Sequence, residues 1–286
     1  MNISMFAKFS GNIKSQGADT ACSIAEKLGF TSVEHIELEL DNSKPTIANE
    51  EDLSKLKYAM DKHGLSMSCY SVAVNLWEKN MTPTTVTTYE KALYNHAKQA
   101  SYLGSPYLHH TLLLGVEKDS LPFEQALELI VPAAIRVAKF AQNIGISCLY
   151  EDQGMYFNGV KNFGRFYSEV KKECPYVGIC GDMGNTLFVD EDPVAFFKAY
   201  VNEMKHVHIK DYIISDKRDS STNWSLSKGG KWLKDSIVGE GNVRIVDCLN
   251  ILKENGYNGA LSLENCHAGD FELGVSKAIS LLRNNF

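Results

Sequence analysis

The chain has 286 residues, of which 44% are hydrophobic and 22% charged, and its formal net charge is −6. These values are ordinary for a globular protein that buries a full core. The acidic balance argues against a nucleic-acid partner, because nucleic-acid binding requires a basic face or stripe.

Short apolar runs alternate with longer amphipathic stretches through the first half of the chain. We expect strands at the short runs and helices where apolar residues recur every three or four positions. Glycines mark the expected helix ends, at Gly29, Gly64 and Gly104. The expected order is strand 3–9, helix 18–30, strand 32–40, helix 49–64, strand 65–74, helix 84–104, strand 106–114 and helix 122–145, with a kink or break at Pro132.

The second half repeats this pattern with one interruption. A polar insertion from Ile213 to about Val238 is expected to be a lid over the active face, a subunit contact or a mobile surface loop. The expected elements are strand 146–152, helix 160–174, strand 177–183, helix 192–204, strand 205–212, helix 243–256, strand 259–265 and helix 270–285.

Eight strand–helix units in one unbroken rhythm predict a parallel sheet. Eight such units in roughly 250 residues or slightly more have the size of a (β/α)₈ TIM barrel, and no linker divides the chain, so we expect one domain over residues 1–286. The alternative is a doubly wound open sheet. That fold usually has a glycine-rich turn after its first strand, and the segment SGNIKSQG does not match the pattern.

The seven cysteines include no C-x-x-C pair, so we expect neither a disulfide framework nor a structural zinc site. Residues 1–11 do not resemble a secretory leader, and no window of 18 uninterrupted apolar residues predicts a transmembrane helix. We therefore expect a reduced, cytoplasmic protein with no membrane partner.

Four consecutive strands in the second half end in residues that bind metal ions. Side chains alternate along a strand, and Glu151, Asp182, His208 and Glu264 share the inward parity of their strands. The strand ends form the active face of a TIM barrel. Three converging carboxylates are tolerable only if a proton or a cation lies between them. Three oxygen ligands with one imidazole suit Mn²⁺, our first expectation, or Mg²⁺, Co²⁺ or Zn²⁺.

Neighbouring positions supply candidate substrate contacts. Lys210 lies one step above His208 and is expected to reach a substrate oxygen, whereas His206, one layer deeper, is expected to be a hydrogen-bonded core residue. Further candidates are Glu37, which could instead cap a loop, Tyr70, which could instead be structural, and His110, which we favour over His109 because Leu108 and Pro106 share its side.

The segments LYEDQG, GDMGN, HVHIKD, GEGNVR and LSLEN occur in that order from residue 149 onward. In this order they resemble the xylose isomerase-like TIM-barrel superfamily, the sugar (phosphate) isomerase/epimerase group that also contains endonuclease IV. The resemblance implies that Glu151, Asp182, His208 and Glu264 take the four metal positions of ketose 3-epimerases, with the two glutamates doubling as acid and base. It also implies a carbohydrate substrate and a dimer or tetramer.

The chain departs from this pattern at informative positions. Asn185 stands where endonuclease IV and many ketose epimerases have a histidine, so we expect Asn185 to contact substrate. No histidine occurs between His208 and His267, and the third-strand histidine is replaced in SCYSVAVNL, which disfavours an endonuclease IV-like phosphodiesterase. A non-enzymatic sugar-binding protein is less expected still, because it would have no need of three rim carboxylates.

The expected chemistry is proton abstraction α to a carbonyl, with Glu151 and Glu264 as acid and base around an enediolate. Return of the proton to the same carbon or to its neighbour gives epimerisation or isomerisation. The alternative on the same site is a dehydratase acting on a keto-polyol of the inosose type. The segment 239–242, Gly-Glu-Gly-Asn, precedes an expected helix whose N-terminus could hold a phosphate.

Overall fold

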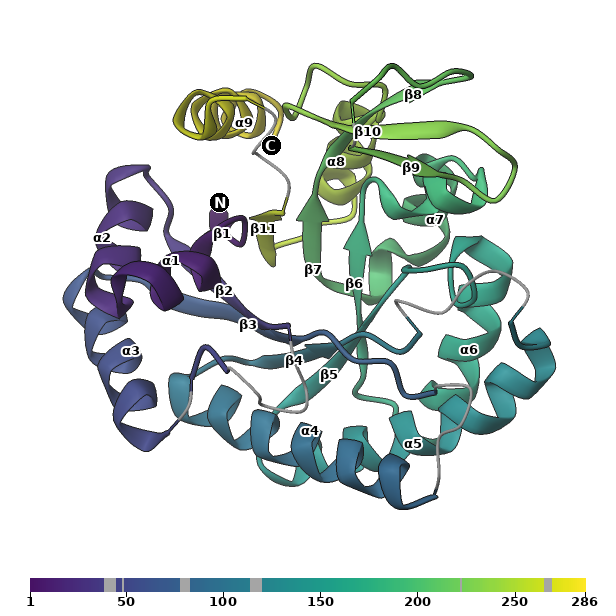
Figure 1. Ribbon diagram of the computed structural model, residues 1–286, viewed down its shortest axis with the longest axis horizontal. Coiled ribbons are helices and arrows are strands. Elements are labelled where there is room, and N and C mark those ends of the chain that lie inside the picture. Colours follow the sequence, from purple (N-terminus) through teal and green to yellow (C-terminus); the bar gives the residue numbers. More distant parts are fainter. Residues whose placement is uncertain (39–44, 48, 78–82, 114–119, 222, 265–268) are drawn as a thin grey trace.

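Eight parallel strands close into a barrel surrounded by helices (Figure 1), which confirms the predicted (β/α)₈ fold. The computed structural model describes residues 1–38, 45–47, 49–77, 83–113, 120–221, 223–264 and 269–286. The strands follow the order β1-β11-β7-β6-β5-β4-β3-β2 around the barrel. Barrel strands that follow one another in the chain are therefore neighbours in space, and their carboxyl ends share one rim.

The barrel strands are β1 (Asn2–Met5), β2 (Ser32–Glu37), β3 (Ser66–Val72), β4 (Tyr107–His110), β5 (Ser147–Glu151), β6 (Gly178–Asp182), β7 (Met204–Ile209) and β11 (Ala260–Leu263). The α-helices are α1 (Phe9–Gln16), α2 (Ala18–Lys27), α3 (Glu50–Lys62), α4 (Pro83–Leu103), α5 (Phe123–Asn143), α6 (Gly159–Glu173), α7 (Pro193–Tyr200), α8 (Ile245–Glu254) and α9 (Phe271–Asn285). Two short 3₁₀-helices, η1 (Asn185–Val189) and η2 (Val201–Glu203), flank α7.

Side-chain caps explain where several helices begin. The side chain of Asn49 accepts a hydrogen bond from the amide of Asp52 and so caps α3, and Asp192 caps α7 in the same way through Val194. Helix α5 continues through Pro132, so the alternative of a break there is wrong. The segment from Phe9 to Gln16, expected to be strand end and loop, forms α1, so that expectation is also wrong.

The barrel interior is unusually polar below the rim. Ser4 and Ser68 share a 2.7 Å hydrogen bond there, and Glu34 and His206 are fully buried. The apolar core lies instead between strands and helices, where aromatic rings of α6 and α7 such as Phe163 and Phe196 pack. Buried polar groups of this kind are tolerated only when they are hydrogen-bonded, so the interior is built around specific partners.

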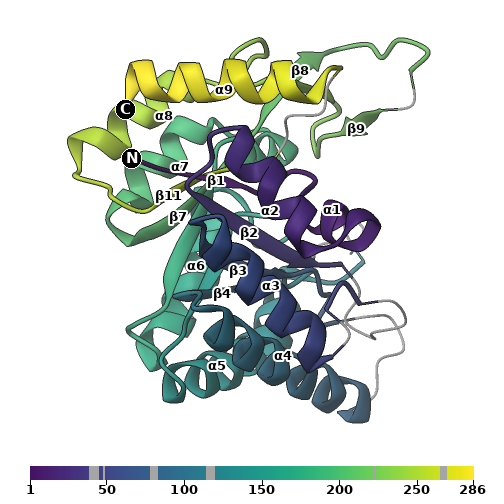
Figure 2. The same cartoon turned by 90° about the vertical axis from the view of Figure 1, so that its left-hand side faces the viewer.

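The insertion after β7 forms its own small sheet rather than an irregular loop. Strands β8 (Asp211–Ser215), β10 (Trp232–Ser236) and β9 (Trp224–Leu226) pair antiparallel in that order and project beyond the end of β7 (Figure 1). The two chain termini lie near each other (Figure 2). The described cysteines are buried and form no disulfide, and no helix in the described ranges is long and apolar enough to cross a membrane.

Candidate active site

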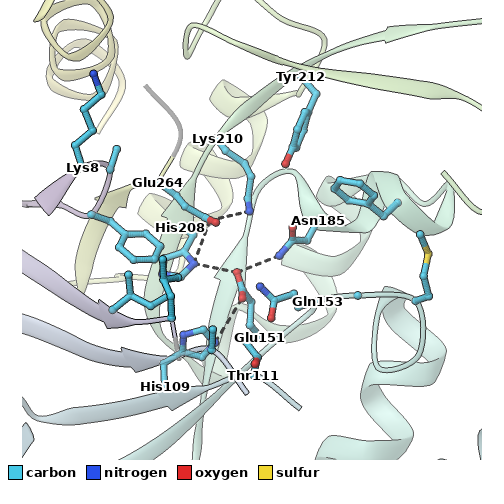
Figure 3. Close-up of a pocket in the computed structure, with 18 residues that line it drawn as sticks. Lys8, His109, Thr111, Glu151, Gln153, Asn185, His208, Lys210, Tyr212 and Glu264 are labelled. Carbon is cyan, nitrogen blue, oxygen red and sulfur yellow. Dashed lines mark hydrogen bonds and ion pairs between the residues drawn. The ribbon is translucent and has the colours of Figure 1, made fainter. Parts of the chain in front are cut away.

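The ends of four neighbouring strands bring together the four predicted metal ligands. Glu151 and Asp182 are the last residues of β5 and β6, His208 is the penultimate residue of β7, and Glu264 directly follows β11. Each offers a ligand atom, and these atoms lie within 4.8 Å of one another. Nδ1 of His208 is 2.9 Å from Oε1 of Glu151 and 3.4 Å from Oε2 of Glu264 (Figure 3).

The cluster faces a cavity of about 530 Å³, the size of a small-molecule site. Its polar lining includes His109, Asn185 and Lys210 together with three of the predicted ligands, which are Glu151, His208 and Glu264. The remaining wall is largely apolar. Its apolar residues are Phe6, Ala7, Ile36, Leu38, Ala73, Met155 and Phe188. A cavity with one polar and one apolar wall suits a small ring that carries hydroxyls.

Lys210 supplies positive charge to the rim. Its Nζ lies 2.7 Å from Glu264 Oε2 and 3.1 Å from Asp182 Oδ2, and its side chain is buried. Burial alone would lower the pKa of Lys210, but Asp182 and Glu264 raise it well above its ordinary value. The lysine is therefore an ammonium ion, and it lines the cavity. Its contact with a substrate oxygen stays a prediction.

The carboxylates respond differently to the same surroundings. Burial raises the pKa of Asp182 to about 8, and the charges of Glu264 and Glu151 add to this effect against that of Lys210. Burial also opposes ionisation of Glu151, but His208 and His109 lower the pKa of its carboxyl to about 2. Glu151 is thus ionised at neutral pH, whereas Asp182 keeps a proton unless a cation takes its place.

The residues present fit a divalent cation. Oδ2 of Asp182 and Oε2 of Glu264 share one cationic partner, the ammonium of Lys210, and Oε2 of Glu151 is buried without a hydrogen bond. Three buried carboxylates with so little counter-charge are costly unless a further cation joins them. Three carboxylates and one imidazole form an oxygen-rich donor set that accepts Mn²⁺, Mg²⁺, Co²⁺ or Zn²⁺.

Asn185 lies on the cavity wall, where the sequence placed it. Asp182 Oδ1 accepts hydrogen bonds of 2.7 Å from the amides of Gly184 and Asn185, which anchors the start of η1. The Asn185 side chain then donates to Glu151 Oε1 at 3.0 Å (Figure 3). Asn185 therefore holds Glu151 in place as well as lining the cavity.

Glu34, on β2, is a site residue that sequence reasoning missed. Its fully buried carboxylate lies 2.7 Å from Nε2 of His206 and 3.0 Å from Nε2 of His208, and it accepts hydrogen bonds of 2.6 Å from Ser71 and Ser262. Burial opposes its ionisation, but the two histidines hold its pKa well below the usual range. The contact also confirms that His206 is a hydrogen-bonded core residue.

Two predicted substrate contacts, Glu37 and Tyr70, lie outside the large cavity. Glu37 accepts hydrogen bonds of 3.0 Å from the amides of Thr46 and Ile47, which is the capping alternative. The hydroxyl of Tyr70 donates to Gln99 on α4 at 2.7 Å, which is the structural alternative. The Glu37 carboxylate is directed at the loop amides and the Tyr70 hydroxyl at α4, so neither residue lines the large cavity.

The orientation expected for the two histidines of β4 is also wrong. His109 lines the large cavity, whereas Nδ1 of His110 lies 3.0 Å from the carbonyl oxygen of Thr111 and its ring packs edge-on to Tyr150. His110 borders a small cavity of about 10 Å³, which Glu151 also lines. Adjacent histidines carry no parity signal of their own, so the sequence could not decide between them.

The Gly-Glu-Gly-Asn segment is already occupied by a carboxylate of the protein. Asp211 accepts hydrogen bonds of 2.9 Å from the amides of Gly239 and Gly241 and of 3.0 Å from the amide of Val243. A Cβ on Gly241 would lie 2.3 Å from Asp211 Oδ1, which explains the glycine. The amides that could have held a phosphate are thus satisfied internally.

Solved protein structures and curated enzyme sequences are similar to this chain. An inosose dehydratase from Clostridium botulinum (strain Alaska E43) is 26% identical over 145 residues, which cover 49% of this chain and 47% of that enzyme. The chain spans less than half the length of the curated relatives it matches. D-psicose 3-epimerase from Clostridium cellulolyticum H10, solved with D-tagatose, is 13% identical with a TM-score of 0.77, covering 100% of this chain and 99% of that one.

A second structure, a xylose isomerase-like TIM barrel protein from Mycobacterium smegmatis in complex with magnesium, is 15% identical with a TM-score of 0.71. The match covers 99% of this chain and 95% of that one, and at such identities the two structures establish the fold. The family model described as xylose isomerase-like TIM barrel matches residues 22–285. The chain therefore belongs to the xylose isomerase-like TIM barrel family.

Proposed function

We propose that this protein is a divalent-metal-dependent enzyme, with Mn²⁺ as the first candidate ion, that removes a proton α to the carbonyl of a small carbohydrate. The main support is that ligand atoms of Glu151, Asp182, His208 and Glu264 lie within 4.8 Å of one another and that Glu151, His208 and Glu264 line one cavity. When bound, the ion polarises the carbonyl and the adjacent hydroxyl and so favours the enediolate. The internally occupied Gly-Glu-Gly-Asn segment favours a substrate without phosphate.

The side chains of the cavity have separate proposed roles in proton transfer and substrate binding. Oε1 of Glu151 is turned toward His208 and Asn185, which leaves Oε2 to take the proton from carbon. Glu264 is the second acid/base group and returns a proton to the enediolate. Lys210, paired with Glu264 and Asp182, donates a hydrogen bond to a substrate oxygen, and the apolar wall limits the access of water.

Epimerisation or isomerisation is the reaction we put first, because two carboxylates border one cavity and can serve as separate base and acid. Dehydration of an inosose is the second candidate. It is favoured by the matched segments of inosose dehydratases, and it begins with the same proton abstraction before a hydroxyl leaves. By analogy with the superfamily, we also propose that the protein assembles as a dimer or tetramer.

The test is α-proton exchange in D₂O, followed by NMR with Mg²⁺-loaded and EDTA-treated protein. The panel contains D-tagatose, D-allulose, D-fructose, D-fructose 6-phosphate and scyllo-inosose. We expect metal-dependent exchange with at least one unphosphorylated compound, new sugar signals from an epimerase or isomerase, and a new enone or diketone absorbance from a dehydratase. Absence of exchange with every compound would contradict the proposal.

Matched variants assign the acid/base pair. Glu151→Gln and Glu264→Gln should each reduce exchange by at least about 100-fold, because general acid–base catalysis contributes 10²–10⁴-fold. Glu37→Gln is the control and should keep wild-type exchange. Glu37 is a buried carboxylate of the same barrel, but it accepts hydrogen bonds from the amides of Thr46 and Ile47 and does not line the cavity. Full activity in both site variants would refute their assigned roles.

A further inference from the structure

His109 lies in the cavity beside the proposed metal ligands, but the mechanism so far gives it no part. Its side chain is buried, and its ring is edge-on to that of His208, with centroids 5.6 Å apart and an interplanar angle of 80°. Figure 3 shows it directed at Glu151 from the neighbouring strand. Whether His109 has a structural or a functional role depends on the hydrogen-bond partners of its two ring nitrogens.

The hydrogen bonds behind His109 determine which ring nitrogen carries the proton. The Glu34 carboxylate can only accept, and Ser71 donates its one hydroxyl proton to it across 2.6 Å. Oγ of Ser71 also lies 3.1 Å from Nδ1 of His109. Because the serine proton is already used, this second hydrogen bond forms only if Nδ1 of His109 is the donor.

The other nitrogen, Nε2, then presents a lone pair to the cavity. It lies 3.4 Å from Oε2 of Glu151, and both atoms are buried without a hydrogen bond. Two buried acceptors that face each other are unfavourable, and neither can satisfy the other. A ligand that brings donor hydrogens between them relieves both.

We propose that His109 is a catalytic residue that contacts substrate: its Nε2 accepts a hydrogen bond from the hydroxyl of a ketose or keto-polyol next to the carbon that is deprotonated. This inference rests on the proposed function and deepens it. The proton on carbon passes to Oε2 of Glu151, and the C–H electron pair enters the enediolate double bond. The hydroxyl keeps its proton, so His109 orients the C–H bond toward Glu151 without changing its own protonation.

The first test needs no turnover. The full chain with ¹⁵N-labelled histidine and Mg²⁺ is studied by NMR, and the His109 signals are assigned by their loss in His109→Gln. We expect an unprotonated Nε2 whose resonance shifts when D-tagatose, D-allulose or scyllo-inosose is added. A protonated Nε2, or no shift with any of the three probes, would overturn the inference.

The second test compares three variants by α-proton exchange and by Mg²⁺ affinity. His109→Leu removes the acceptor and should lower kcat for exchange about 10- to 100-fold. His109→Gln keeps an acceptor oxygen and should recover most of that loss. His110→Gln, the neighbouring buried histidine outside the large cavity, should retain activity, and Mg²⁺ affinity should stay within about threefold in all three.

The two proposals fail in different ways. Loss of Mg²⁺ affinity in His109→Leu would make His109 a ligand or a support of the metal site and would overturn the inference alone. Equal activity of His109→Leu and wild type would do the same. If wild type exchanges no α-proton, the proposed function fails, whereas the ¹⁵N titration still decides whether His109 contacts a bound ketose.

Discussion

Nε2 of His208 lies 3.0 Å from Oε1 of Glu34, a residue 174 positions away in the chain. This contact occupies the inner nitrogen of the imidazole, so that Nδ1 is turned toward Glu151 and Glu264. A carboxylate that accepts from the far nitrogen of a metal-binding histidine fixes the ring and raises its basicity. Glu34 is therefore a positioning residue for the site.

Replacing Glu34 tests this role. Glu34→Gln should weaken Mn²⁺ binding about 10- to 100-fold, the usual effect of losing such a partner. The reason is that the glutamine NH₂ group would face the histidine and serine groups that now donate to the Glu34 carboxylate. Isothermal titration of the apo-protein measures the affinity. Glu37→Gln, a buried carboxylate on the same strand that does not touch His208, is the matched control. Equal Mn²⁺ affinity of the two variants would contradict the assignment.

Lys210 should stabilise the metal-free protein more than the metal-loaded protein. Lys210→Met leaves Asp182 and Glu264 without a counter-charge, and breaking a buried pair costs about 3–5 kcal/mol. We expect Tm in EDTA to fall by about 5 °C or more, and saturating Mn²⁺ to restore much of the difference. Thermal unfolding followed by circular dichroism is the measurement. A loss of Tm that Mn²⁺ leaves unchanged would argue against a shared cation site.

His110 should make stability depend on pH below neutrality. Burial lowers the pKa of His110 to about 4, compared with 6.5 for an ordinary histidine. Between these values the unfolded chain binds a proton that the folded protein does not, so stability is complete above pH 6.5 and falls as pH drops toward 4. From pH 7 to pH 5 this contribution is about 2 kcal/mol.

Urea unfolding of wild type and His110→Gln at pH 7 and pH 5 isolates this contribution. The decrease in unfolding free energy between the two pH values should be smaller in the variant by about that amount. His63→Gln, at a histidine whose pKa is raised by hydrogen bonding to Glu26, is the control and should not reduce the decrease. An identical pH dependence of wild type and His110→Gln would contradict the prediction.

Asp211 should stabilise the connection between the small sheet and α8. Its carboxylate accepts hydrogen bonds from the amides of Gly239, Gly241 and Val243. Asp211→Ala leaves these amides unpaired, and we expect the unfolding free energy to fall by about 3 kcal/mol, at about 1 kcal/mol or more for each group. Denaturant unfolding checks this value. Asp211→Asn keeps one acceptor oxygen, so its unfolding free energy should lie between those of wild type and Asp211→Ala. An unchanged unfolding free energy in Asp211→Ala would show that water satisfies the amides instead.

The inward faces of the second-half strands were predictable because polar and apolar residues alternate along each of these strands. His206, His208 and Lys210 alternate with apolar residues, so their common direction followed from the period of a strand. The fold order then placed the strand ends side by side. For this reason each of the four proposed metal ligands was predicted individually, and the structure brings these four side chains together.

The first half offered no such contrast. Strand β2 has Glu34, His35 and Glu37 on both faces, and β4 ends in two histidines. Parallel barrel strands are buried on both sides, so polarity alone does not say which residue faces the interior. A register irregularity between Val33 and Glu34 adds to the ambiguity. Here partners distant in sequence decide, such as the Ile47 amide for Glu37 and His208 for Glu34.

The sequence by itself determined the alternation of strands and helices, and with it the barrel and the place of the four strand-end residues proposed as metal ligands, because these depend on local periodicity and chain order. Only the tertiary structure decided that Glu34 supports His208, that His109 rather than His110 enters the cavity, and that the insertion folds into a sheet. These outcomes depend on register and on hydrogen-bond partners supplied by distant strands, neither of which a local pattern contains.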